Sequence, residues 1–306
     1  MTFGWTALAV HPLTFAYPPM PTSLPDAPIG IFDSGVGGLS VLRHIRAQLP
    51  HEHLLYFADS GFAPYGDKPE HVVTARVLAI GAFLIDQGAK AIVVACNTAT
   101  VAAIAALRAR YPGMPIVGVE PGLKPAAASS RNGLVGVLAT ERTLSGAKFL
   151  LLRDQVAENT GARFLLQPCI GLADQIEFGT LESSETDALL RRFIAPLLDE
   201  GADALVLGCT HYPLVVASIE RVIAACTDRP VTLIDTGEAV ARQLARLLSA
   251  DGIARAAGDV PARLDGYTSA SGTALSAAFN GLLGVDPPVH EVVADAGQGI
   301  VIGPNN

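Results

Sequence analysis

Two cysteines stand in closely similar surroundings, one in each half of the chain. Cys96 lies within IVVACNT (residues 92–98), and Cys209 lies within ALVLGCTH (residues 204–211). In both segments an apolar run of strand length ends in a small residue, and the cysteine precedes a threonine-bearing step into a helix-like stretch. Ligands of open α/β sheets bind beyond the carboxyl ends of the strands, and a helix N-terminus favours a thiolate. Two matched thiols therefore suggest a symmetric acid/base reaction.

A glycine-rich turn follows the first expected strand, within GIFDSGVGGLS (residues 30–40). Its backbone amides could hold an anion such as a phosphate or a carboxylate. A dinucleotide site gains some support from Asp59 at the end of the next strand, but Ser40 occupies the place of the third glycine. A tight turn without a ligand is the alternative. Asp33 favours a functional turn, because a carboxylate there can orient a ligand's ammonium group or a neighbouring thiol.

Several further side chains could take part in a site. A lone histidine is more often structural than functional, but His211 lies two positions after Cys209 and could set the charge of that thiol. Tyr65 and Gly66 lie on a loop rich in proline and glycine, where the tyrosine hydroxyl is available to a ligand. Zinc would need four ligands, and no CxxC pair or second histidine cluster completes a set, so we expect no metal site.

The pattern of apolar and polar residues predicts the architecture. From residue 29, strand-like and helix-like stretches alternate as in a parallel sheet with helices on both faces, and the rhythm restarts after Pro121. We therefore expect an α/β fold of two pseudo-symmetric doubly wound domains with mainly parallel sheets and an active-site cleft between them. One helix is expected at residues 144–158. The expected first domain comprises residues 29–120 and 231–306, and the second comprises residues 121–230.

The composition is that of a globular enzyme. The chain has 306 residues, half of them hydrophobic and 16% charged, which suits two domains of about 150 residues each. A net charge of −8 and scattered lysines argue against a nucleic-acid partner. Four cysteines are too few for a disulfide framework, so a reducing cytoplasm is the expected compartment. Cys169 and Cys226 fit small buried hydrophobes.

The N-terminal segment and the apolar stretches lack targeting features. Residues 1–28 hold six prolines and neither lysine nor arginine, unlike a secretory signal, so we expect a dispensable extension outside the core. The longest weakly charged stretch, residues 91–107, is interrupted by Asn97, Thr98 and Thr100. It is no bilayer span, and we expect no membrane partner.

Six blocks, in order along the chain, resemble the glutamate racemase family. They are FDSGVGG (32–38), YFADS with PYG (56–60 and 64–66), ACNTA (95–99), GVEP (118–121), LGCTHYP (207–213) and ID (234–235). The blocks fall between residue 29 and about residue 248. The broader aspartate/glutamate racemase superfamily shares the two cysteines but not the combination of the motifs DSGVGG and CTHYP.

The resemblance implies a cofactor-independent racemase that binds glutamate and supplies D-glutamate for peptidoglycan, a role in cell-wall biogenesis and cell shape. It implies that Cys96 and Cys209 are the proton donors and acceptors, the first acting on D-glutamate and the second on L-glutamate. Asp33 would support the first thiol and His211 the second, with Glu177 as an acid near His211. The implied substrate contacts are Asp33, Ser34, Tyr65, Gly66, Asn97, Thr98, Thr143, Thr210 and His211.

The chemistry agrees with the resemblance. Racemising an amino acid means removing a weakly acidic α-proton and returning one to the opposite face, so an acid and a base must flank one carbon. Each group serves as base in one direction and acid in the other, which requires a pKa near the working pH. Thiols start closer to that range than carboxylates or hydroxyls. Asp33 would oppose a thiolate at Cys96 and could accept its proton, whereas a helix N-terminus would favour that thiolate.

Four alternatives remain at this point. The substrate could be a related acidic amino acid such as aspartate. A pyridoxal-dependent racemase would need a lysine facing a ligand at a strand end, and none stands there. A dinucleotide-binding oxidoreductase would explain the glycine-rich turn, and a two-lobed binding protein would grip glutamate without needing either thiol. The oligomeric state stays open, with a homodimer as one option.

Overall fold

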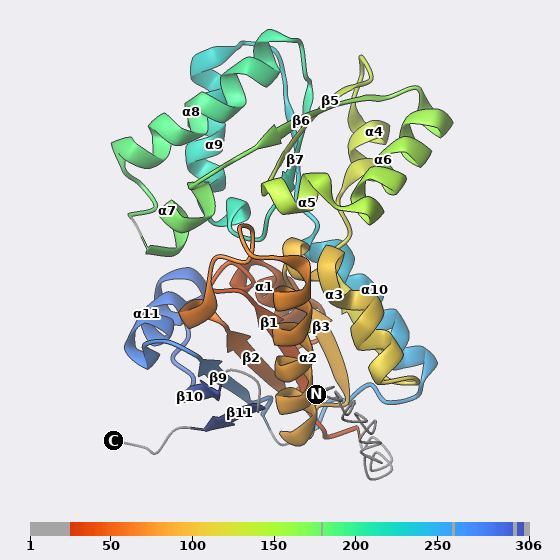
Figure 1. Ribbon diagram of the computed structural model, residues 1–306, viewed down its shortest axis with the longest axis vertical. Coiled ribbons are helices and arrows are strands. Elements are labelled where there is room, and N and C mark those ends of the chain that lie inside the picture. The colour runs from red at the N-terminus through yellow and green to blue at the C-terminus, as the bar shows by residue number, and fades with distance from the viewer. Residues whose placement is uncertain (1–24, 179, 259–260, 296–298, 303–306) are drawn as a thin grey trace, which may run out of the picture.

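The computed structural model describes residues 25–178, 180–258, 261–295 and 299–302, which form two sheets stacked end to end (Figure 1). The strands of the first sheet are β1 (Ile29–Asp33), β2 (Leu54–Ala58), β3 (Ala91–Val94), β4 (Ile116–Gly118), β9 (Leu264–Thr268), β10 (Val289–Asp295) and β11 (Gly299–Ile302). Those of the second are β5 (Leu134–Ala139), β6 (Arg163–Pro168), β7 (Ala204–Gly208) and β8 (Thr232–Ile234).

The two sheets share a strand order. The first runs β11-β10-β9-β2-β1-β3-β4, and the second runs β6-β5-β7-β8. The four strands of the second sheet are therefore arranged in the same order as β2-β1-β3-β4 of the first sheet. Every pairing is parallel except that of β10 with β11. The prediction of a two-domain α/β fold with mainly parallel sheets is confirmed.

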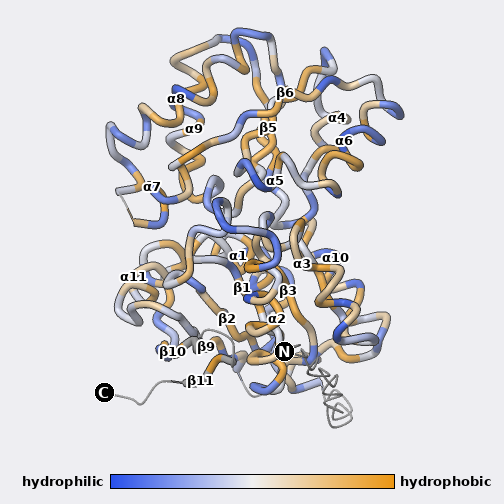
Figure 2. Tube along the Cα trace, in the orientation of Figure 1, coloured by the Kyte–Doolittle hydropathy of each residue, from blue (hydrophilic) through white to orange (hydrophobic). Residues whose placement is uncertain are grey.

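Helices cover both faces of each sheet because the central strands are apolar on both sides. On the first sheet, one face packs on α2 (Glu70–Asp86) and α3 (Asn97–Arg110), and the other on α1 (Leu39–Gln48), α10 (Gly237–Ala250) and α11 (Gly272–Leu283). On the second sheet, α7 (Leu172–Phe178), α8 (Ser184–Asp199) and α9 (Val216–Cys226) face α4 (Leu123–Ser129), α5 (Glu141–Ser145) and α6 (Ala147–Thr160) across the strands. Figure 2 shows the hydrophobic strands between these layers.

Three expectations about the elements need correction. Strand β8 pairs with β7, so the second domain extends to residue 234 instead of ending at residue 230. The helix expected at residues 144–158 is two helices, because the chain is extended at Gly146, where a Cβ would lie 2.2 Å from Val101 Cγ1 of α3. Helix α4 and the antiparallel strand β11 were not anticipated.

The predicted N-terminal extension falls largely outside the described residues, but residues 25–28 contact the first domain. Lys90 Nζ donates to the carbonyls of Pro25 and Ile253 and pairs with Glu52 Oε2 at 2.6 Å. The backbone N–H of Lys90 donates to the carbonyl of Pro28. The core therefore begins before residue 29. None of the described helices is long and apolar enough to cross a membrane.

The buried Lys90–Glu52 pair makes a testable contribution to the first domain. Both side chains are at most 1% exposed. Lys90→Met keeps the apolar stem but leaves Glu52 as a buried, unpaired charge, so urea unfolding should show a loss of about 3–5 kcal/mol. The matched control is Arg242→Met, which breaks the exposed pair with Glu238 and should cost under about 1 kcal/mol. Equal losses for the two variants would contradict this account.

Candidate active site

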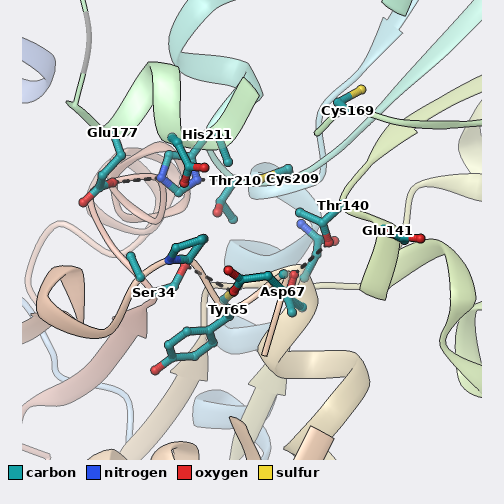
Figure 3. Close-up of a pocket in the computed structure, with 18 of the residues that line it drawn as sticks. Ser34, Tyr65, Asp67, Thr140, Glu141, Cys169, Glu177, Cys209, Thr210 and His211 are labelled. Carbon is teal, nitrogen blue, oxygen red and sulfur yellow. Dashed lines mark hydrogen bonds and ion pairs between the residues drawn. The ribbon is translucent and has the colours of Figure 1, made fainter. Parts of the chain in front are cut away.

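The residues that follow the strands of both sheets line one cavity between the domains. Ser34 follows β1 and Cys96 follows β3, while Thr140 follows β5 and Cys209 follows β7. In both domains these strands flank the point where the strand order reverses, which is where open α/β sheets bind ligands. The cavity has a volume of about 240 Å³ (Figure 3). Each domain therefore contributes one thiol to the same cavity.

Cys96 is the N-cap residue of α3. Its Sγ accepts a hydrogen bond from Ala99 N at 3.5 Å, and its thiol lies 3.8 Å from Ser34 Oγ. The helix N-terminus that favours a thiolate is thus in place. Burial and the negative charge of Asp33 outweigh it, however, and raise the pKa of Cys96 well above its usual value. These effects favour the protonated thiol of Cys96 near neutral pH.

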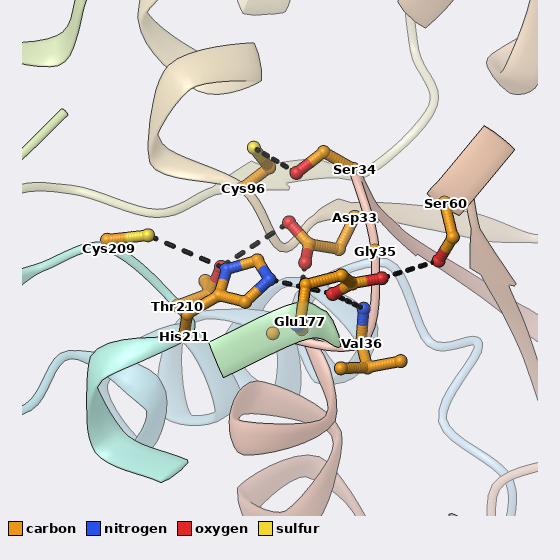
Figure 4. A network of polar contacts seen from close by, with 12 residues as sticks. Asp33, Ser34, Gly35, Val36, Ser60, Cys96, Glu177, Cys209, Thr210 and His211 are labelled. Carbon is orange, nitrogen blue, oxygen red and sulfur yellow. Dashed lines mark hydrogen bonds and ion pairs between the residues drawn. The ribbon is translucent and has the colours of Figure 1, made fainter. Parts of the chain in front are cut away.

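Cys209 lies beside a buried ion pair. His211 Nδ1 is 3.6 Å from Cys209 Sγ, and His211 Nε2 is 2.8 Å from Glu177 Oε2 (Figure 4). Burial alone would lower the pKa of His211, but its contacts with Cys209 and Glu177 raise that pKa well above the usual value. Burial would raise the pKa of Glu177, but hydrogen bonds from His211, Ser60 and Val36 hold it below its usual value. The pair is therefore an imidazolium beside a carboxylate.

The glycine-rich turn binds an anionic side chain of the protein itself, the carboxylate of Glu177. Val36 N donates to Glu177 Oε2 at 2.8 Å. A Cβ at Gly35 would lie 2.3 Å from Glu177 Oε2, and one at Gly37 would lie 2.4 Å from His211 Nδ1. Neither glycine has a positive φ, so close approach of the second domain, and not backbone freedom, requires them.

Asp33 lies behind the cavity wall and is fully buried. Gly38 N donates to its Oδ2 at 2.8 Å, and Thr210 Oγ1 of the second domain lies 3.4 Å from its Oδ1. Burial raises the pKa of Asp33 to about 6, although His211 and the Gly38 N–H act in the opposite direction. A carboxyl group with this pKa can exchange a proton near neutral pH.

Asp59, the carboxylate that supported a dinucleotide site, is fully buried inside the first domain. It accepts hydrogen bonds from Tyr65 Oη at 2.7 Å, from Arg76 Nε at 2.7 Å and from Ser269 Oγ at 2.6 Å. The expectation that the Tyr65 hydroxyl is available to a ligand is therefore wrong, because Asp59 engages it. Asp59 is therefore not placed to bind the ribose of a dinucleotide, and the dinucleotide hypothesis loses its support.

Three threonine hydroxyls meet where the domains touch on the other side of the cavity. Thr98 of α3 lies 3.0 Å from Thr140, and Thr143 lies 3.0 Å from Thr140 and 3.4 Å from Thr98 between their Oγ1 atoms. Thr143 is fully buried behind the other two. Of the two threonines at α5, Thr140, the N-cap of the helix, lines the cavity and Thr143 does not.

The structure brings together most of the predicted site residues. The cavity wall includes Ser34, Tyr65, Gly66, Cys96, Asn97, Thr98, Glu177, Cys209, Thr210 and His211, with Asp33 and Thr143 behind it. The wall also includes residues that sequence reasoning missed, namely Ala63, Pro64, Asp67, Thr140, Glu141, Cys169, Ile170, Gly171, Ala173 and Asp174. Thr140 had a signal, because it follows β5 as Cys209 follows β7. Within the described chain, no group of three or more His, Cys, Asp or Glu residues is placed to hold a metal ion.

Comparison with known proteins identifies the family. Residues 29–244 match the family model described as Asp/Glu/hydantoin racemase. The chain belongs to this family. It is 55% identical over 224 residues to a glutamate racemase of Pseudomonas aeruginosa, and the alignment covers 73% of this chain and 82% of that protein.

Solved structures of the family share the fold. A glutamate racemase isoform of Bacillus anthracis aligns with a TM-score of 0.77 at 30% identity, covering 89% of this chain and 98% of that one. The glutamate racemase of Francisella tularensis, solved in complex with D-glutamate, aligns with a TM-score of 0.75 at 26% identity, covering 89% and 98%. This chain thus shares the fold of these glutamate racemases.

The close approach of the domains at the glycine turn predicts the effect of a single methyl group. Gly37→Ala should push His211 away from its position and lower kcat/KM for racemisation by about a hundredfold, because misplacement of about 1 Å has that effect. The control is Gly281→Ala in α11, where an added Cβ meets no atom within 4 Å. That variant should keep its activity and gain up to about 1 kcal/mol of stability. Full activity in Gly37→Ala would refute the interdomain contact.

Proposed function

We propose that this protein racemises glutamate by a two-base reaction in which Cys96 and Cys209 face opposite sides of the substrate's α-carbon. The observation that carries the proposal is that the two thiols enter one cavity from equivalent strand ends of two domains. From L-glutamate, the Cys209 thiolate takes the α-proton as the Cα–H bond breaks. Cys96 then gives its thiol proton to the other face, which yields D-glutamate, a Cys209 thiol and a Cys96 thiolate.

The charges around the two thiols suit the form of the enzyme that reacts with L-glutamate, in which Cys209 is the base and Cys96 the acid. The imidazolium of His211 stabilises negative charge on Cys209, while burial and Asp33 keep Cys96 protonated. In the reverse direction Cys96 must lose its proton, and Asp33, with a pKa of about 6, is the nearby acceptor. The two thiols thus share one reaction but rely on different supporting groups.

Neutral groups and one imidazolium would bind the substrate. The cavity wall, as far as the chain is described, includes neither lysine nor arginine. The carboxylates would therefore bind the hydroxyl of Thr140, the N–H groups at the start of α3, and His211. The side-chain oxygen of Asn97 is buried without a partner among the described residues, and it suits the ammonium group.

The product would serve cell-wall synthesis. Glutamate racemases bind this substrate in solved structures, among them the Francisella tularensis enzyme with D-glutamate. By this likeness we infer that the chain supplies D-glutamate for peptidoglycan without a bound cofactor. A circular-dichroism assay of both enantiomers of glutamate and of aspartate, with no cofactor added, tests the substrate and the cofactor requirement together.

Solvent deuterium distinguishes two bases from one. In deuterated water, D-glutamate formed from L-glutamate should carry deuterium from the first turnovers, because the donating thiol is not the one that took the proton. Cys96→Ala and Cys209→Ala should each lower racemisation by about two to four orders of magnitude while the fold is retained. A near-native rate in either variant, or early product that keeps the substrate's own proton, would sink the two-base reaction.

The titration of Asp33 predicts a pH dependence. Below its pKa of about 6, Asp33 is protonated and cannot accept the proton of Cys96. We therefore expect kcat/KM for D-glutamate to fall about tenfold for each pH unit below this value. In Asp33→Asn the rate at neutral pH should be low and this acid limb should be absent. A wild-type rate that stays level down to about pH 5 would contradict the role of Asp33.

A further inference from the structure

Glu177, which faces His211, is held by the opposite domain at both of its oxygens. Ser60 Oγ donates to Glu177 Oε1 at 2.7 Å, and Val36 N donates to Oε2 at 2.8 Å, beside His211 Nε2 (Figure 4). The Glu177 side chain is only 5% exposed. Because a buried carboxylate has little access to water, the loss of one donor leaves it poorly solvated.

The residues on either side of Ser60 are held in place by contacts within the first domain. It opens the short 3-10 helix η1 (Ser60–Phe62), directly after Asp59, which Arg76 holds through two hydrogen bonds. Gly61 N donates to Ser269 Oγ at 3.1 Å, and a Cβ at Gly61 would lie 2.3 Å from the Ser269 carbonyl oxygen. Neighbours on both sides thus fix the position from which Ser60 reaches Glu177.

We propose that Ser60 is a positioning residue for proton transfer at Cys209, because its hydroxyl fixes Glu177 and, through Glu177, the imidazolium of His211. This inference rests on the two-thiol reaction proposed above. Ser60 and Val36 belong to the first domain, whereas Glu177 and His211 belong to the second. The alignment at Cys209 is therefore complete only while the two domains are closed on each other.

The contact itself can be measured without any activity. A double-mutant cycle of Ser60→Ala and Glu177→Gln in urea unfolding should give a coupling of about tenfold in the unfolding constant, or about 1.4 kcal/mol. Ser130→Ala is the matched control, because Ser130 Oγ also donates to a carboxylate, that of Asp203, far from the cavity. Ser130→Ala should show no coupling to Glu177→Gln.

The positioning role is tested by kinetics. Ser60→Ala should lower kcat for L-glutamate about tenfold and leave KM within about twofold, because the lost alignment acts on proton transfer and not on binding. The isotope effect with α-deuterated L-glutamate should rise, while that with α-deuterated D-glutamate, whose proton goes to Cys96, should not. Ser60→Thr keeps the hydroxyl and should restore wild-type values, and Ser130→Ala should retain them throughout.

Each result decides one step. An absent coupling would overturn the contact, and it can be seen even if the protein does not racemise glutamate. Coupling with unchanged kcat and isotope effects would make Ser60 a structural tie and overturn its positioning role. Failure of the two-thiol reaction would appear separately, as racemisation that survives in the cysteine variants.

Discussion

The ion pair between Glu177 and His211 is the contact on which the rest of the site depends. Two buried charges are stable only where both are paired and their remaining hydrogen-bonding positions are filled. Both residues come from the second domain, but the groups that complete the carboxylate, Val36 N and Ser60 Oγ, come from the first. The glycines of the turn are small so that the pair can reach them. Closing the domains therefore completes the charge arrangement beside Cys209.

The two halves share a topology but not a charge pattern. The strand order around β1 and β3 repeats around β5 and β7, which brings one thiol from each domain to the cavity. Beside Cys209 stands an imidazolium, whereas beside Cys96 stands the buried carboxyl group of Asp33. A symmetric reaction at one carbon needs two bases, but they need not be activated in the same way. Burial and Asp33 thus raise the pKa of the Cys96 thiol, whereas Cys209 lies beside a positive charge.

Local sequence patterns predicted the parts of this site that depend on local structure. Strands β2 and β5 begin and end where their apolar runs do, and β1 ends one residue later, at Asp33. Cys96 and Cys209 lie at strand ends as expected. The sequence could not show what the glycine turn binds, because Glu177 lies more than a hundred residues away. It suggested a ligand for the Tyr65 hydroxyl, because the sequence does not show that Asp59, six residues away, engages that hydroxyl. It suggested a single helix across Gly146, where the chain is extended and α3 lies too close for a Cβ. Tertiary contacts decided each of these points.

The protonation state of His211 tests the central claim most directly. Nitrogen-15 NMR of the labelled protein, with the signals of His211 assigned by their loss in His211→Asn, reports whether both ring nitrogens carry protons. The account predicts an imidazolium at about pH 8, where an ordinary histidine with a pKa of about 6.5 is neutral. A neutral ring at that pH, titrating near the ordinary value, would contradict it.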